Sequence, residues 1–255
     1  MLEAMEFQQR EWAIDVTTQD RFLRLCDIDA GIYAENVDPS AFVALAIRET
    51  ERNGVVLPAA LHSGQRLVMR RPMRLGESMQ MEGRVCDRQK VERGELLTCE
   101  ARLRDGLGEV VLESIEQLLI PDPSVTAAKK SSSAAAVPAL RAVASVRFRP
   151  EQVASYCGRE VNPIHFDPEA AQRAGLRAPI IGGEQGVRHV MAALWKAHEP
   201  RYLDINSRFL RPVFWDDECT IVVEEKEGRW QTVSLAKAEK KAMEVAIDHM
   251  QSSKL

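Results

Sequence analysis

Glu160-Val161-Asn162-Pro163-Ile164-His165 lies just past the middle of the chain and carries two groups that can exchange a proton. A carboxylate that takes up a proton and an imidazole that holds one form a general acid–base pair. Pro163 fixes its own φ angle and favours an extended conformation at the residue before it, so the segment predicts a rigid turn between the two side chains. On these residues alone, a solvent-facing glutamate and a structural histidine are an equally good interpretation.

The surrounding residues, Tyr156 to Ala171, resemble the signature of the MaoC-like, (R)-specific enoyl-CoA hydratase and dehydratase family. That signature is an aromatic residue and a short spacer, then Gly-Asp-x-Asn-Pro-Ile-His and Asp-Pro-Glu. Members of the family add water to trans-2-enoyl thioesters or remove it from (R)-3-hydroxyacyl thioesters. The resemblance implies an α+β fold, a double hot-dog, in which each half is an antiparallel sheet wrapped around a central helix. By position it also implies that Glu160 and His165 are catalytic and that Asn162 supports substrate binding.

Two positions depart from the family signature. Glu160 stands where the family has Asp, and Arg159 stands where it has Gly. The additional methylene of glutamate moves the carboxylate outward by about 1.5 Å, one carbon–carbon bond. Misplacement on this scale can cost on the order of 100-fold in rate. The site is therefore expected to be active with an adjusted loop, to be slow, or to bind without catalysis.

A glycine-rich segment, 179–186, opens the long helix that the apolar spacing predicts over 184–196. Glycines at a helix start leave backbone N–H groups accessible, and the helix dipole there favours negative charge. In the family, a glycine at this helix start donates its N–H to the thioester carbonyl, which gains negative charge in the transition state. The resemblance thus implies this role for Gly186, with Gln185 beside it as a substrate-binding residue. A glycine turn needed only for backbone geometry is the other interpretation.

Basic side chains of the second half could bind the phosphate of a phosphopantetheine arm. Among them, Arg211 is the candidate substrate-binding residue. Solvated or ion-paired side chains are the simpler interpretation for Arg211, as for Arg208 and Lys196. The sequence does not distinguish CoA from an acyl-carrier protein as the carrier of the acyl group.

The composition is ordinary for a globular protein, with 45% hydrophobic and 28% charged residues among 255. The 34 basic and 38 acidic residues give a net charge of −4, which argues against a nucleic-acid or anionic-membrane partner. No apolar run is long enough to span a bilayer, and the polar start is unlike a secretory signal, so we expect a cytoplasmic protein. The five cysteines are scattered without zinc-ligand spacing, so we expect reduced thiols and no metal or other cofactor.

An Ala/Ser/Lys-rich linker at 123–142 divides the chain into halves, 1–122 and 143–255. Each half contains an Arg-Pro pair, at 71–72 and 211–212, followed by alternating apolar residues and Gly-containing turns. These features predict two meanders, with strands near 79–85, 96–103 and 110–115 and near 220–223, 230–235 and 243–247. The same order in both halves indicates a duplicated unit.

Helices are predicted over 150–157 and 167–174, and over 39–52 as the first-half counterpart of the long helix. The first half has no acid–Asn-Pro-Ile-His motif. Its His62 could contact a substrate, but a strand or loop histidine is more often structural. The resemblance implies that the first half accommodates the acyl chain and that the second half carries the chemistry.

The sequence therefore predicts a hydro-lyase that hydrates trans-2-enoyl thioesters of CoA or an acyl-carrier protein, or runs the reverse dehydration. A non-catalytic acyl-thioester binding or partner subunit is the alternative, motivated by the changes at positions 159 and 160. A hot-dog thioesterase is a third and less favoured reading, since it would not need the Asn-Pro-Ile-His turn. A homodimer is possible, because a duplicated chain can act alone or pair again.

Overall fold

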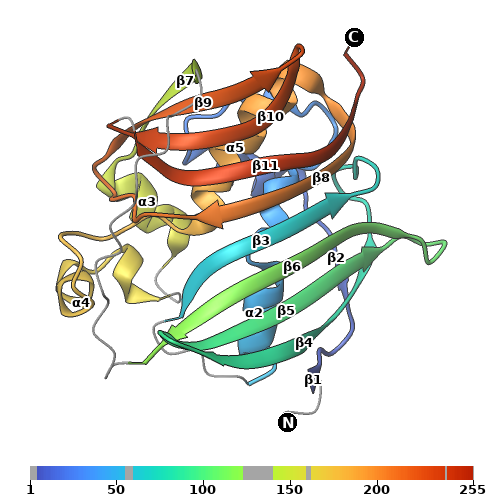
Figure 1. Cartoon of the computed structure of the whole chain (residues 1–255). Coiled ribbons are helices and arrows are strands. Elements are labelled where there is room, and N and C mark those ends of the chain that lie inside the picture. Colours follow the sequence, from blue (N-terminus) through green and yellow to red (C-terminus); the bar gives the residue numbers. More distant parts are fainter. Residues whose placement is uncertain (1–4, 55–59, 123–139, 159–161, 239, 255) are drawn as a thin grey trace.

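A single antiparallel sheet runs through the whole molecule (Figure 1). The computed structural model describes residues 5–54, 60–122, 140–158, 162–238 and 240–254. Its 11 strands follow the order β1-β4-β5-β6-β3-β8-β11-β10-β9-β7, with β2 paired to β4. The first half contributes β1 (Met5–Glu6), β2 (Arg10–Trp12), β3 (Leu61–Met69), β4 (Met79–Val91), β5 (Gly94–Arg104) and β6 (Val110–Pro121). The second half contributes β7 (Arg141–Arg147), β8 (Pro200–Phe209), β9 (Glu218–Lys226), β10 (Arg229–Lys237) and β11 (Lys240–Ser252).

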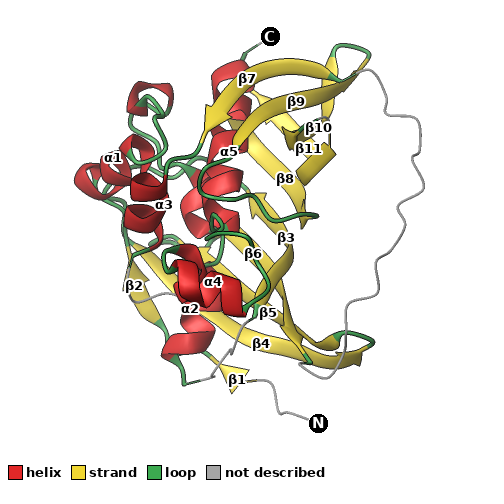
Figure 2. Ribbon diagram, turned by 90° about the vertical axis from the view of Figure 1, so that its left-hand side faces the viewer, coloured by secondary structure: helices red, strands yellow, loops and turns green. Residues whose placement is uncertain are grey.

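The two halves meet where β3 pairs with β8, in a register that runs from Gly64 opposite Arg208 to Met69 opposite Leu203. Helices cover one side of the curved sheet (Figure 2). They are α1 (Val16–Arg24), α2 (Leu45–Arg52), α3 (Pro150–Cys157), α4 (Pro168–Arg173) and α5 (Gly183–His198), with short 3-10 turns η1 (Ala30–Ile32), η2 (Pro39–Phe42) and η3 (Pro163–His165). No helix in the described ranges is long and apolar enough to cross a membrane.

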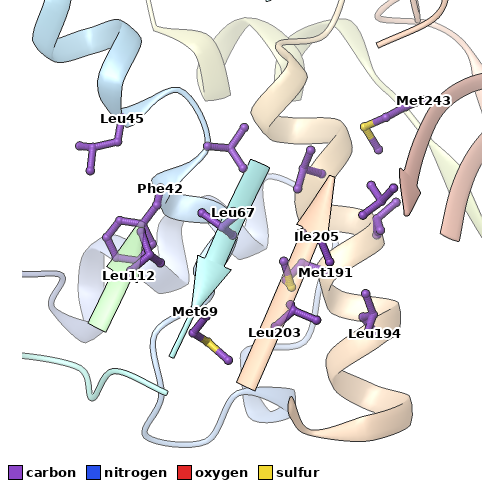
Figure 3. Close-up of a cluster of buried hydrophobic side chains, with 14 of the residues drawn as sticks. Phe42, Leu45, Leu67, Met69, Leu112, Met191, Leu194, Leu203, Ile205 and Met243 are labelled. Carbon is purple, nitrogen blue, oxygen red and sulfur yellow. The ribbon is translucent and has the colours of Figure 1, made fainter. Parts of the chain in front are cut away.

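The core is continuous between the halves (Figure 3). Side chains from η2, α2 and β3 of the first half belong to the same buried cluster as side chains from α5, β8 and β11 of the second. The labelled members are Phe42, Leu45, Leu67, Met69, Leu112, Met191, Leu194, Leu203, Ile205 and Met243. The fold is thus the α+β double hot-dog that the sequence predicts, with the junction of its halves inside the core.

The helices with strong local signals are confirmed. The α3 helix starts at Pro150, and Gly158 follows it with a φ of +69°. The α4 helix has Asp167 as its N-cap, with the carboxylate accepting from the Glu169 N–H at 2.9 Å. The predicted strands of both meanders are present as β4 to β6 and β9 to β11.

Two segments differ from the sequence prediction. The helix expected over 39–52 is interrupted: η2 ends at Phe42, Ala44 adopts a left-handed conformation with φ of +66°, and α2 begins at Leu45. A residue in that conformation cannot continue a right-handed helix. The predicted linker 123–142 lies outside the described residues up to 139, and its last residues, from Arg141 on, belong to β7.

Candidate active site

His165 is held at the end of η3, a turn built by the Asn-Pro sequence before it. Asn162 caps the turn by accepting the Ile164 N–H at 3.3 Å, and Pro163 occupies its first position. The Nδ1 atom of His165 lies 2.9 Å from the Ile180 carbonyl oxygen. Since a carbonyl only accepts, Nδ1 carries the proton and Nε2 keeps its lone pair in the neutral ring. Burial lowers the pKa of His165, which keeps the ring neutral at pH 7.

The strand-like segment around Ile180 ties this turn to the start of α5. The Ile180 N–H donates to the Ile164 carbonyl at 3.1 Å, and the Ile181 N–H donates to the Val213 carbonyl at 2.9 Å. Gly182 follows immediately as the N-cap of α5. The imidazole of His165 therefore lies against the segment that leads directly into the positive end of the longest helix.

The start of α5 leaves two backbone donors outside the helical ladder. The Gln185 N–H and the Gly186 N–H both point to the Gly182 carbonyl, at 3.0 Å and 3.4 Å. The N–H groups of Gly183 and Glu184, the first two residues of α5, have no acceptor in the described part of the chain, and the N-cap residue Gly182 has no side chain to accept from them. The sequence placed the helix start at Glu184, which would have left the Gly186 N–H free. Because the helix begins at Gly183, the N–H groups of Gly183 and Glu184 join that of Gly186 as candidate donors to an anionic oxygen.

Gly183 is also closely covered by two rings from the centre of the sheet. A Cβ atom at this position would lie 2.8 Å from Cε1 of Phe209 on β8 and 3.3 Å from Nδ1 of His62 on β3. Only glycine fits such an approach without displacing a neighbour. Sequence reasoning did not single out Gly183. The adjacent glycines at 182 and 183, ahead of a helix, were the available signal.

A network of partly buried polar and charged side chains fixes the second residue of α5. The Glu184 carboxylate accepts from the Tyr156 hydroxyl at 2.9 Å, from Arg48 at 2.7 Å and from Arg188 at 3.1 Å. Arg188 also donates to the Tyr156 hydroxyl at 2.9 Å and to Asp38 at 2.5 Å. These partners keep the guanidinium charged despite its burial and raise the pKa of Arg188. Because Tyr156 lies in α3, the network connects α3 to α5.

The other residues named from the sequence have varied surroundings. Glu160 lies outside the described residues. The Gln185 side chain is 1% exposed and interacts with the buried thiol of Cys26 of the first half. Arg211 donates to the Lys241 carbonyl at 2.5 Å on an exposed edge. Among the described residues, no three His, Cys, Asp or Glu side chains are grouped so as to hold a metal ion.

A family model matches part of this chain. The sequence profile described as MaoC like domain matches residues 132–246, a range that includes Asn162, His165 and the whole of α5. No curated protein sequence matches the chain significantly.

Solved structures match nearly the full length. HtdX of Mycobacterium tuberculosis matches with a TM-score of 0.77 and 19% identity, over 96% of this chain and 99% of that one. A MaoC-like dehydratase of Phytophthora capsici matches with a TM-score of 0.72 and 16% identity, over 99% and 97%. The peroxisomal multifunctional enzyme type 2 of Drosophila melanogaster matches with a TM-score of 0.68 and 17% identity, over 96% of this chain and 48% of that longer one. At these identities the likeness concerns the fold.

Proposed function

The second half of this chain carries a MaoC-like domain over residues 132–246, and from that premise we propose that the protein is a hydro-lyase acting on acyl thioesters. The reaction is the reversible hydration of a trans-2-enoyl thioester to an (R)-3-hydroxyacyl thioester, carried on CoA or an acyl-carrier protein. The observation that carries the proposal is the neutral His165, fixed through Nδ1 at 2.9 Å from Ile180 O and followed closely by the uncapped start of α5.

In the proposed mechanism, the Glu160 carboxylate and the Nε2 atom of His165 hold one water molecule. The water oxygen attacks the β-carbon while its proton passes to this pair, and the electron pair of the double bond moves towards the thioester oxygen. The backbone N–H groups of Gly183 and Glu184 stabilise the enolate-like oxygen that forms. A proton is then delivered to the α-carbon, which completes hydration. Dehydration is the same path reversed.

The first half is proposed to accommodate the acyl chain. Its helix α2 spans 8 residues, Leu45 to Arg52, whereas α5 spans 16. A shorter helix covers less of the curved sheet, and long strands such as β4 and β5 extend beyond it. This difference between the halves supports, by geometry, a division in which one half binds the chain and the other reacts.

A second candidate function is acyl-thioester binding without turnover. It is favoured by Glu160 standing in place of the family's aspartate and by Arg159 standing in place of glycine. Thioester hydrolysis is the least favoured reading, because it gives no role to the Asn-Pro-Ile-His turn.

The test is loss of the enoyl-thioester absorbance with crotonyl-CoA and with a longer trans-2-enoyl-CoA. Glu160→Gln and His165→Ala are each expected to lower kcat by about 100-fold or more, since general acid–base catalysis contributes on that scale. Matched controls are Glu169→Gln, whose side chain is 86% exposed, and His249→Ala on the exposed part of β11. Both controls are expected to retain full activity.

The same assay separates the alternatives. Turnover that appears only in Glu160→Asp would establish a binding protein whose carboxylate is misplaced for catalysis. Absence of turnover in every variant, with both CoA and acyl-carrier-protein thioesters, would overturn the hydro-lyase proposal.

A further inference from the structure

His62 of the first half lies against the candidate active site of the second. It is on β3, and its ring packs on Phe209 of β8 with a centroid separation of 4.5 Å. The two rings together cover Gly183, and the Nδ1 atom of His62 would be 3.3 Å from a Cβ there. Gly183 contributes one of the two backbone N–H groups at the start of α5 that have no acceptor among the described residues, and His165 is held by Ile180 O just upstream. An imidazole from each half therefore lies close to the same helix start.

The ring of His62 has one nitrogen that nothing in the described part of the chain satisfies. Its Nε2 atom is buried and has no hydrogen-bond partner there. Burial lowers the pKa of His62 to about 4, while a hydrogen bond to the Gly64 backbone opposes this shift, so the ring is neutral at pH 7. A neutral imidazole has one unprotonated nitrogen, and Nε2 in that state requires a donor.

Leaving such a nitrogen unpaired in the free protein destabilises the fold, because buried polar groups normally find partners. If the His62 ring served only to pack on Phe209, a phenyl ring would do so without an unpaired nitrogen. The acyl part of an enoyl thioester contains no O–H or N–H donor near its carbonyl. A 3-hydroxyacyl thioester contains one, the hydroxyl on the β-carbon, two bonds from the carbonyl carbon that would lie at the α5 start.

We propose that His62 is a substrate-positioning residue of the first half, whose Nε2 accepts a hydrogen bond from the 3-hydroxyl group of a bound 3-hydroxyacyl thioester. The inference rests on the proposed function and adds a specificity element to it. His62 distinguishes the hydroxylated from the unhydroxylated ligand and orients the hydroxyl relative to His165. The site then contains residues from both halves of the chain.

Equilibrium binding of two ligands tests this, measured in the Glu160→Gln background to prevent turnover. The ligands are (R)-3-hydroxybutyryl-CoA and butyryl-CoA, which differ at the hydroxyl group. His62→Phe is expected to weaken binding of the hydroxylated ligand by about five- to tenfold, the loss of one hydrogen bond, and to leave butyryl-CoA binding unchanged. His62→Gln, which offers an acceptor oxygen, is expected to restore part of the difference.

Thermal unfolding of the same variants separates positioning from packing. His62→Phe is expected to be at least as stable as its parent, since the ring volume is kept and an unpaired nitrogen is removed. His189→Phe is the matched control, because His189 is also a neutral histidine packed on an aromatic ring, Phe148, and it should discriminate the ligands as the parent does. Equal weakening of both ligands in His62→Phe, or no change in either, would overturn the inference. No binding of butyryl-CoA to the parent would instead count against the proposed function.

Discussion

The carboxyl group of Glu116 on β6 is fully buried and lies against the first turn of α2. It accepts the Ala46 N–H at 3.1 Å, the Ile47 N–H at 2.9 Å and the Ser114 hydroxyl at 2.8 Å. These three donors favour the ionised form, but burial outweighs them and raises the pKa of Glu116 from its ordinary 4.5 to about 7. In the first half, a side chain of the protein thus accepts from the helix start, whereas no side chain among the described residues caps the start of α5.

Replacement of Glu116 should change the pH dependence of stability. A folded-state pKa above the unfolded one gives stability that is complete below pH 4.5 and is lost as the pH rises through about 7. Relative to Glu116→Gln, the wild-type free energy of unfolding is expected to fall by about 3 kcal/mol between those limits. Urea denaturation from pH 4.5 to pH 8 measures this. Glu109→Gln in the exposed turn before β6 is the control, and a difference between wild type and Glu116→Gln that does not vary with pH would contradict the prediction.

At the scale of the element, α2 begins at a strained residue. Ala44 has φ of +66° and ψ of +15°, the left-handed region that non-glycine residues seldom adopt. The conformation separates η2 from α2 and brings the first N–H groups of α2 to Glu116. Packing of the helix against the long strands β4 to β6 sustains a backbone conformation that local preference disfavours.

The Ala44→Gly substitution is expected to stabilise the protein by about 1 kcal/mol, because it removes the steric cost of the left-handed conformation. Within the same helix, Ala46→Gly should destabilise by about 1 kcal/mol or more, since it adds backbone freedom to the unfolded chain and removes a buried methyl group. Chemical denaturation of the two variants under identical conditions compares them. Destabilisation by both substitutions would mean that Ala44 does not bear this strain.

At the scale of the molecule, the two halves share a sheet, a core and a buried ion pair. Arg188 of α5 and Asp38 of the first half are 2.5 Å apart, with side-chain exposures of 2% and 0%. Asp38 also accepts the Ser40 N–H at 3.0 Å, so its carboxylate serves both halves. Neither half could keep its own member of this pair buried if the other half were absent, since an isolated charge is costly inside a protein.

Double-mutant cycles measure this connection. Arg188→Met and Asp38→Asn are each expected to lower the free energy of unfolding by about 3–5 kcal/mol, and the double variant by less than their sum, because each single change leaves a buried group without its partner. The matched control is the exposed pair between Arg149 and Asp27, which also joins the halves, with exposures of 51% and 56%. The coupling energy between Arg149 and Asp27 should stay below about 1 kcal/mol. Equal coupling energies in the two cycles would show that burial does not set the strength of the connection.

Local signals in the sequence determined several elements of this protein. Pro150 and Gly158 bound α3, Asp167 caps α4, and the Gly-containing turns separate the meander strands, because these residues act on the backbone within a few positions. The Asn-Pro-Ile-His turn is of the same kind, and His165 is placed by it. Glu160 remains a prediction from sequence.

Tertiary structure alone decided the rest. The pairing of β3 with β8 brings His62 and Phe209, far apart in the chain, against Gly183. The start of α5 at Gly183, one residue before the predicted start, depends on where the Ile180 segment is held between His165 and Val213. Such contacts depend on packing between segments that lie apart in the chain, more than a hundred residues in the case of His62, and local residue preferences carry no information about them.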